Sequence, residues 1–243
     1  IGQEATATGI CSMLTLSDYI TSTHRGHGES IAKGVFAIND MSEDELRQRC
    51  PEFADLSGRK LRAAVMEDHV YRTIAELFGK EEGYGKGRGG SMHIADFRIG
   101  HLGANAIVGG GVPIATGAAM TARLERDEGR IVAAFAGDGA YSNGVVLESL
   151  NWASQKQFTG EMAEDPFGLP ILYCIVNNHY GMTGRAESEV SGVDYLARRA
   201  AGFHRRNMHA EVVNGMDVLA CCDAVERARK TLAGARSKGI RSV

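Results

Sequence analysis

Two short polar segments each follow an apolar run, and together they carry the residue types of a magnesium–phosphate site. The Gly-Asp-Gly segment 137–139 comes directly after the run 131–136, and the Asn-Asn pair 177–178 comes directly after the run 171–176. Glycine lets backbone N–H groups approach an anion closely, but a carboxylate repels a phosphate unless a cation lies between them. Magnesium accepts carboxylate, amide-carbonyl and phosphate oxygens together. The two segments therefore predict a metal–diphosphate site.

Either segment alone is at least as typical of an ordinary turn, because glycine, asparagine and aspartate favour turn conformations. What favours a ligand site is the combination. Both segments end a buried apolar run, and ligands of open parallel sheets bind at the carboxyl ends of the strands.

The apolar runs 131–136 and 171–176 lack polar–apolar alternation, which is typical of parallel strands covered on both faces. The residues around them predict an α/β fold, a parallel sheet flanked by helices. Ser42 and Glu45 form a capping-box pattern, and Pro113 suits the first turn of a helix. Helices are expected over residues 4–15, 58–78, 113–126, 142–157 and 216–236. The apolar residues of the helix 58–78 are expected near one stripe: Leu61, Val65, Ile74, Leu77 and Phe78. Residues 16–34 are expected to form a strand or turn that feeds a loop, and residues 210–213 a further strand.

Composition excludes several classes of protein. The 27 basic and 30 acidic residues give a net charge of -3, unlike the basic excess of nucleic-acid binders. Residues 99–122 carry no charge, but their glycines, His101 and Pro113 favour a buried loop entering a helix over a membrane span. The 5 cysteines include no CxxC pair and fit reduced thiols in a cytoplasmic protein. The missing initiator methionine leads us to expect a fragment.

A glycine-rich segment, residues 85–90, matches the dinucleotide-binding pattern GxGxxG by letter. It lacks the preceding hydrophobic strand and the following helix that this pattern requires, so we do not predict a nicotinamide site.

Seven segments, which follow one another in order and cover most of the chain, point to a known family. They are IGQEA (1–5), STHRGHG (22–28), GKGRGGSMHIAD (85–96), ANAIVGGGVPIATGAA (104–119), AFAGDGA (134–140), LESLNWA (147–153) and IVNNHYGM (175–182). Together they resemble the alpha subunit of the decarboxylating component of 2-oxo acid and acetoin dehydrogenase complexes. These enzymes depend on thiamine diphosphate. The resemblance implies a single thiamine-diphosphate-binding domain over residues 1–243, with a helical insertion at 35–70 and a loop insertion at 158–168.

The resemblance also implies roles for individual residues. The magnesium ligands would be the side chains of Asp138 and Asn178 and the carbonyl of Tyr180. The diphosphate would be met by Gly137, Gly139, Ala140, Arg25 and the neighbouring His24. The aminopyrimidine ring would be met by Ala106 and Val108, with Val108 as an apolar wedge that bends the cofactor. Two plainer interpretations stay open: Arg25 as a solvated loop charge, and Val108 as ordinary core.

The implied activity is cleavage of a carbon–carbon bond in acetoin or a 2-oxo acid such as pyruvate, with transfer of the acyl unit to a lipoyl group on an acyltransferase core. The segments 22–28 and 31–34 look closer to acetoin dehydrogenase than to pyruvate dehydrogenase. In this family the glutamate that activates the pyrimidine comes from a separate beta subunit, so an alpha2beta2 assembly is implied. No general acid or base is assigned within this chain.

Two alternatives remain. One is an inactive structural or regulatory paralogue that binds a beta-like partner without turnover. The other is a magnesium-dependent phosphate-ester enzyme that uses Asp138, which would need further carboxylates near the strand ends.

Overall fold

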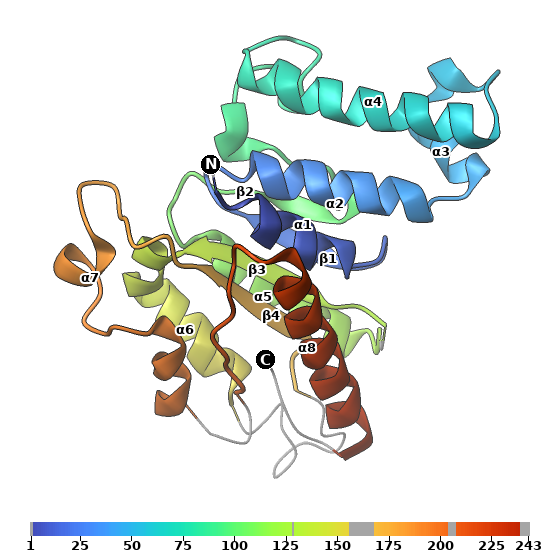
Figure 1. The fold of residues 1–243 in the computed structure, drawn as a ribbon. Coiled ribbons are helices and arrows are strands. Elements are labelled where there is room, and N and C mark those ends of the chain that lie inside the picture. Colours follow the sequence, from blue (N-terminus) through green and yellow to red (C-terminus); the bar gives the residue numbers. More distant parts are fainter. Residues whose placement is uncertain (1, 128, 156–167, 204–207, 239–243) are drawn as a thin grey trace.

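The computed structural model describes residues 2–127, 129–155, 168–203 and 208–238. A parallel sheet with the strand order β2-β1-β3-β4 lies at the centre of these residues (Figure 1). The strands are β1 (Tyr19–Ser22), β2 (His101–Ala104), β3 (Val132–Gly137) and β4 (Ile171–Val176). β3 and β4 stay in continuous register up to the pair Gly137–Val176. The predicted α/β fold with a parallel sheet flanked by helices is confirmed.

Helices cover both faces of the sheet. One face packs against α5 (Gly111–Leu124) and α6 (Gly144–Ala153), and the other against α1 (Glu4–Ser12) and α8 (Val218–Lys238). β3 shows why its sequence is an unbroken apolar run. Val132, Ala134 and Ala136 belong to the first apolar cluster, whereas Ala133 and Phe135 belong to the second. Successive side chains of a strand point to opposite faces, so a strand covered on both faces needs apolar residues throughout.

A third apolar cluster lies beside the sheet, where α4 covers the outer side of α2 (Figure 1). This region contains α2 (His27–Asp40), α3 (Glu43–Arg49), the short 3-10 helix η1 (Pro51–Phe53) and α4 (Gly58–Leu77). The predicted capping box starts α3: the Glu45 amide donates to Ser42 Oγ at 3.3 Å, and the Ser42 amide donates to the Glu45 carboxylate at 2.7 Å. Residues 35–70 are therefore mainly helical, as expected.

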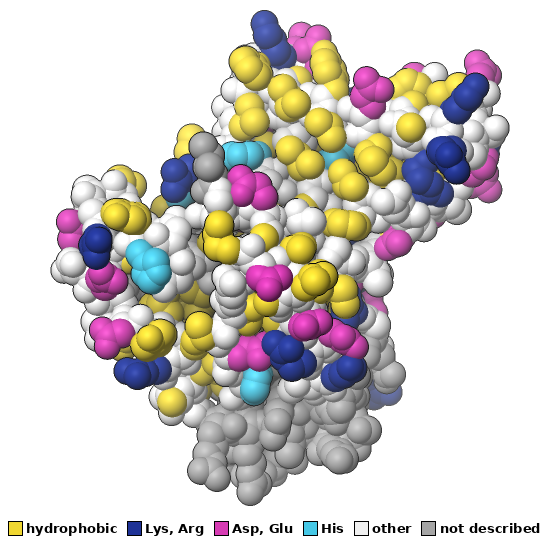
Figure 2. All heavy atoms as spheres, viewed as in Figure 1, with side chains coloured by type: hydrophobic (Ala, Val, Ile, Leu, Met, Phe, Trp, Pro, Cys, Tyr) yellow, Lys and Arg dark blue, Asp and Glu magenta, His cyan; other side chains and the backbone are white. Residues whose placement is uncertain are grey.

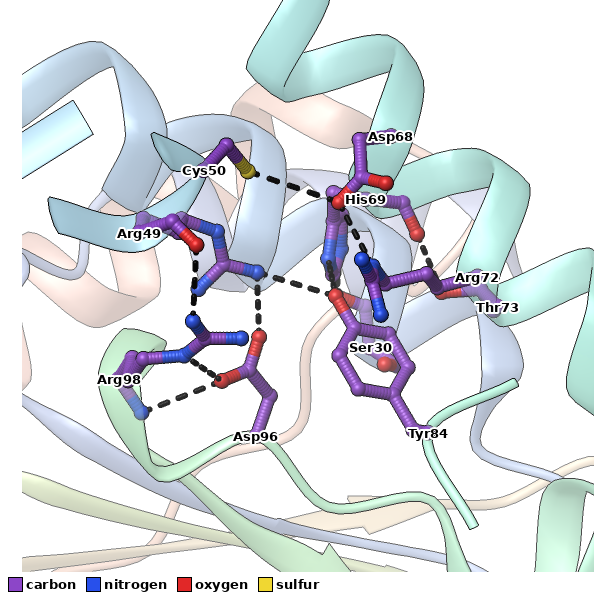
Figure 3. A network of polar contacts seen from close by, with 10 residues as sticks. All are labelled: Ser30, Arg49, Cys50, Asp68, His69, Arg72, Thr73, Tyr84, Asp96 and Arg98. Atoms are coloured by element: carbon purple, nitrogen blue, oxygen red, sulfur yellow. Dashed lines mark hydrogen bonds and ion pairs between the residues drawn. The ribbon is translucent and has the colours of Figure 1, made fainter. Parts of the chain in front are cut away.

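The buried face of α4 changes from apolar to polar along the helix. Leu61 and Val65 are fully buried in the first half, and His69, Thr73 and Glu76 take their place in the second. His69 hydrogen-bonds to the hydroxyl of Tyr84 and to the carbonyl of Ser30 (Figure 3). The apolar residues expected to continue the stripe are exposed instead: Ile74, Leu77 and Phe78. Exposed apolar side chains gather on the face over α4 and α2 (Figure 2).

A buried ion pair fastens this helical region to the segment that leads into β2. Arg49, at the end of α3, contacts the Asp96 carboxylate at 2.5 Å, and both side chains are at most 3% exposed. Arg49 also donates to the Tyr84 hydroxyl at 3.0 Å, which extends the network to His69 (Figure 3). Because a buried charge is costly without a partner, Arg49 and Asp96 depend on each other, and the network links α3 and α4 to the segment before β2.

Several expectations need correction. Residues 16–34 contain β1 and the start of α2, so the loop between them is only residues 23–26. The strand β2 falls where we expected only a loop. Residues 210–213 do not form a strand: no described strand pairs with them, so they lack the hydrogen-bond ladder that a strand requires. The expected insertion at 158–168 lies outside the described residues except for Gly168.

The other expected helices differ only at their ends, and the connections contain short helical segments. These are η2 (Gly90–His93), η3 (Phe97–Ile99), η4 (Asp138–Ser142), α7 (Ala186–Glu189) and η6 (Leu196–Gly202). Among the helices in the described ranges, none is long and apolar enough to cross a membrane.

Candidate functional site

All of the predicted site residues lie in the segments that follow the four strands. Since the strands are parallel, their carboxyl ends meet at one edge of the sheet. β1 is followed by His24 and Arg25, and β2 by Ala106 and Val108. β3 ends at Gly137 and runs directly into η4, which contains Asp138, Gly139 and Ala140, while β4 is followed by Asn177, Asn178 and Tyr180. The fold thus brings the four predicted segments to the same edge.

Asp138 is the central charged residue of this edge. Its side chain is 2% exposed, and one carboxylate oxygen accepts the Gly139 amide at 2.7 Å. The other oxygen, Oδ2, is buried and has no hydrogen-bond partner among the described residues. An unpaired buried carboxylate oxygen is costly, and a bound cation is a common reason for one. The space beside Gly137 is open, because a Cβ built there would meet nothing within 4 Å.

The segment after β4 is an asparagine-rich turn. Asn177 Oδ1 accepts the His179 amide at 3.1 Å, and Asn178 Oδ1 accepts the Tyr180 amide at 3.0 Å. His179 adopts a positive φ of 66°, which the turn requires. Asn177 and Asn178 therefore form a turn, as the plainer interpretation predicted. A ligand role stays compatible with this turn, because an amide oxygen that accepts one hydrogen bond keeps a second lone pair. A Cβ built on Gly139 would lie 3.6 Å from the Cα of Gly181, so this turn adjoins the Gly-Asp-Gly segment.

His24 and Arg25 occupy the tight turn between β1 and α2. The Gly26 amide donates to the Thr23 carbonyl at 3.0 Å, and the helix begins at the next residue. Arg25 is exposed and forms no ion pair with another described side chain, so its guanidinium is available to an anion at this edge. Partial burial, together with the charge of Arg25, lowers the pKa of His24. The positive end of α2 adds to the anion-binding character of the turn.

The segment after β2 is held against the start of α6 by a residue that we did not predict. Asn143 donates from Nδ2 to the carbonyl of Val108 at 3.0 Å, while its Oδ1 accepts the Val145 amide at 3.3 Å and caps α6. Gly109 has a φ of 89°, and a Cβ there would lie 3.3 Å from the Ala140 carbonyl. Val108 remains 38% exposed, which suits contact with a ligand better than a place in the core. An asparagine before a helix signals a cap, but its bond to a residue 35 positions away cannot be read from sequence.

Among the described residues, no further carboxylates gather around Asp138. Within the described part of the chain, the one group of three or more potential ligands from histidine, cysteine, aspartate and glutamate is Cys50, Glu52 and Asp68, in the helical region. A phosphate-ester enzyme with several acidic metal ligands is therefore disfavoured. The donor set at the edge is one carboxylate with neutral amide and carbonyl oxygens, which suits a magnesium ion that also binds phosphate oxygens.

These features fit a magnesium–diphosphate group. The orphaned Oδ2 of Asp138 supplies a negative ligand for a cation, and the Arg25 turn supplies a positive group for the phosphates. Ala106 and Val108 are exposed, and a Cβ built at Gly137 would meet nothing within 4 Å, so these positions leave room for the remainder of a ligand.

The chain is also similar in sequence to known proteins. Residues 59–236 match the family model described as dehydrogenase E1 component. The chain is 39% identical over 227 residues to the alpha subunit of acetoin:2,6-dichlorophenolindophenol oxidoreductase from Bacillus subtilis, covering 93% of this chain and 54% of that protein. It is 35% identical over 233 residues to the protein of the same name from Cupriavidus necator, covering 94% and 55%.

A pyruvate dehydrogenase relative is nearly as similar. The pyruvate dehydrogenase E1 component subunit alpha of Porphyra purpurea is 34% identical over 239 residues, covering 94% of this chain and 56% of its own length. The chain thus spans about half the length of the curated relatives that it matches.

Proposed function

The chain belongs to the dehydrogenase E1 component family, and on this basis we propose that it binds thiamine diphosphate and magnesium as the alpha-type subunit of an enzyme acting on acetoin or a 2-oxo acid such as pyruvate. The observation that carries the proposal is the buried Asp138 carboxylate at the edge where four strand ends meet, because its Oδ2 has no hydrogen-bond partner in the part of the chain that the structure describes. Family membership implies use of thiamine diphosphate, and the donor set at this edge supports magnesium as its counterion.

In the proposed site, Asp138, Asn178 and the Tyr180 carbonyl hold the metal. Arg25, assisted by His24, offsets the charge of the diphosphate, and the backbone at Gly137, Gly139 and Ala140 lies along it. Ala106 and Val108 contact the pyrimidine ring.

Thiamine diphosphate, when bound, stabilises the carbanion that forms when a bond next to a carbonyl is cleaved. The role of this chain is to bind and orient it: Asp138 fixes the metal, the Arg25 turn fixes the phosphates, and Asn143 keeps Val108 at the wall of the site. In the proposed reaction the acyl unit passes to a lipoyl group on an acyltransferase core. The two acetoin relatives share 39% and 35% identity with this chain, and the pyruvate relative shares 34%, which favours acetoin over pyruvate.

We further propose a beta-type partner that supplies the pyrimidine-activating glutamate, in an alpha2beta2 assembly. The relatives are named as alpha subunits, and this chain exposes an apolar face that suits a protein contact. That face consists of Tyr71, Ile74, Leu77 and Phe78 on and after α4. Surfaces of this kind mark protein contacts more often than isolated exposed apolar residues do. The 5 cysteines are free thiols, which supports a cytoplasmic location. Residues 35–70 and 158–168 are proposed as insertions relative to the family.

The proposal is tested by calorimetry with thiamine diphosphate in magnesium and, separately, in excess chelator. We expect saturable binding that requires magnesium, and no binding of thiamine, which lacks the diphosphate. Equal binding of thiamine and thiamine diphosphate would contradict the metal–diphosphate site. Turnover requires addition of the partner.

A further inference from the structure

The carboxylate of Glu76 lies at the centre of the glycine-rich segment that resembled a dinucleotide-binding motif. Glu76, near the end of α4, is 1% exposed. Its Oε2 accepts the amides of Gly85 and Gly87 at 2.7 and 2.8 Å, and its Oε1 accepts those of Gly89 and Gly90 at 2.9 and 3.0 Å. Successive backbone N–H groups in such a loop form an anion-binding concavity. Here the anion is the protein's own carboxylate rather than a phosphate.

The bonding pattern requires an ionised carboxylate. Burial raises the pKa of Glu76, but the four backbone hydrogen bonds outweigh burial and lower it overall. An ionised carboxylate accepts hydrogen bonds at both oxygens, which an amide side chain cannot do. Glutamine at this position would therefore leave part of the loop without its acceptors.

The glycines are needed because the loop wraps tightly around the end of α4. A Cβ at Gly83 would lie 2.4 Å from the Glu76 carboxylate, and a Cβ at Gly87 would lie 2.3 Å from the backbone of Gly79. Gly87 also has a positive φ of 68°. The loop thus has one tight conformation around Glu76.

This loop touches the proposed site through its next residue. Ser91 follows Gly90 directly, and its hydroxyl donates to the carbonyl of His24 at 3.0 Å. Arg25, the proposed phosphate-binding residue, comes immediately after His24. A continuous path of contacts therefore runs from the Glu76 carboxylate through Gly90 and Ser91 to the turn that carries Arg25.

We infer that Glu76 is a positioning residue for the Arg25 turn: by organising the loop 85–91, its carboxylate holds Ser91 where it fixes the His24 carbonyl, and so sets the diphosphate-binding conformation of Arg25. This inference rests on the proposed function, because it assumes that Arg25 binds the diphosphate. It differs from a purely stabilising role, since it requires that Glu76 and Arg25 act on the same binding step.

The test is a double-mutant cycle on the Kd of thiamine diphosphate with magnesium, measured by calorimetry on the full chain well below its melting temperature. We expect Glu76→Gln to raise the Kd by about tenfold and Ser91→Ala by about fivefold, the size of one lost hydrogen-bonded contact. In an Arg25→Ala background, Glu76→Gln should raise the Kd by less than about twofold, because coupled residues are not additive.

The matched control is Glu45→Gln, which weakens the capping box of α3 far along the chain from the loop. It should lower the melting temperature without changing the Kd. If Glu76→Gln does not fold, Ser91→Ala alone decides, since it removes one side-chain hydroxyl and leaves the carboxylate in place.

Three results would overturn the inference. A wild-type Kd in both Glu76→Gln and Ser91→Ala would reduce Glu76 to a structural role. A full effect of Glu76→Gln in the Arg25→Ala background would show that it acts elsewhere. A wild-type chain that binds no thiamine diphosphate would overturn the proposed function and the inference with it. In the first two results, wild-type binding that is weakened by Arg25→Ala leaves the proposed function standing, and only the inference fails.

Discussion

The side chain of Asn143 bonds at once to the carbonyl of Val108 and to the amide of Val145, so one residue joins the segment after β2 to the helix after η4. The segment after β2 carries Ala106 and Val108, and Asn143 directly follows η4, which contains Asp138. Asn143 therefore holds Val108 in a fixed position relative to the turn that contains Asp138.

Replacing Asn143 with serine keeps one of its two contacts, the cap of α6, and removes the other, the hydrogen bond to the Val108 carbonyl. Serine is as good an N-cap as asparagine, so the stability of α6 should be nearly unchanged. Its short side chain no longer bridges to the Val108 carbonyl, and we expect the Kd of thiamine diphosphate to rise about threefold to tenfold, the effect of losing one neutral hydrogen bond. Calorimetry measures the Kd and thermal melting measures stability. The control is Asn151→Ser on the exposed side of α6; an equal rise in that variant would argue against the positioning role.

Loss of the Asp96 carboxylate should destabilise the chain severely. Burial opposes ionisation of Asp96, yet the hydrogen bond and charge of Arg49 outweigh it and lower the pKa of Asp96. Asp96→Ala leaves the buried Arg49 guanidinium unpaired, and we expect a loss of about 3–5 kcal/mol in the free energy of unfolding, measured with urea. Glu226→Gln, which removes an exposed contact with Lys230, serves as control and should change little. A small effect of Asp96→Ala would mean that water or other groups solvate Arg49.

Stability should fall in mild acid because of His101. Burial lowers the pKa of this fully buried residue from 6.5 to about 4, where its Nε2 and Ser22 Oγ hydrogen-bond at 2.8 Å. Between these two values the unfolded chain binds a proton that the folded chain does not, so unfolding becomes more favourable as the pH falls. We expect a loss of about 3 kcal/mol between pH 6.5 and 4 from this residue.

Urea unfolding at several pH values tests this expectation. His101→Asn should reduce the slope of stability against pH in that window, whereas His93→Gln, at an exposed histidine, should not. A slope that His101→Asn leaves unchanged would assign the acid sensitivity to other groups.

Features of the fold and the site could be predicted where they depend on residues close together in the sequence. Features that depend on contacts between residues far apart in the sequence could not. Asp138 and Asn178 follow apolar runs, so their meeting at one edge was predictable from the parallel sheet. The α3 cap was predictable because Ser42 and Glu45 are three residues apart. By contrast, Glu76 resembles a surface acid of an amphipathic helix, and only the folded loop shows that it is buried.

The errors have the same origin. The start of α2 was expected to be a loop because its first turn is rich in glycine. The helix forms because it packs against α1 and α4. The apolar residues Ile74, Leu77 and Phe78 were expected in a buried stripe, but polar side chains that bond to Tyr84 and the glycine loop take the buried positions of α4. Intrinsic helix preference and periodicity do not report such tertiary partners.

The apolar face on α4 should contact the proposed partner. Purified alone, the chain should show no turnover of acetoin or pyruvate, and turnover should appear when a beta-type subunit is added. Phe78→Ser, at a residue that is 75% exposed, should weaken that association at least about tenfold if Phe78 is an interface anchor, as measured by analytical ultracentrifugation. Leu124→Ser, a similarly exposed apolar residue at the end of α5, is the control. Robust turnover by the chain alone would contradict the subunit assignment.

Binding of thiamine diphosphate and magnesium to Asp138→Asn tests the proposed metal site most directly. The substitution keeps the size of the side chain but removes the charge from the unpaired Oδ2. In the absence of ligand, the variant should be at least as stable as the wild type, since it removes an uncompensated buried charge. Calorimetry should show magnesium-dependent binding to the wild type and a loss of at least about a hundredfold in the variant, as expected when a charged metal ligand is removed. An unchanged, magnesium-dependent Kd in a folded Asp138→Asn chain would contradict the proposed metal-binding role of Asp138.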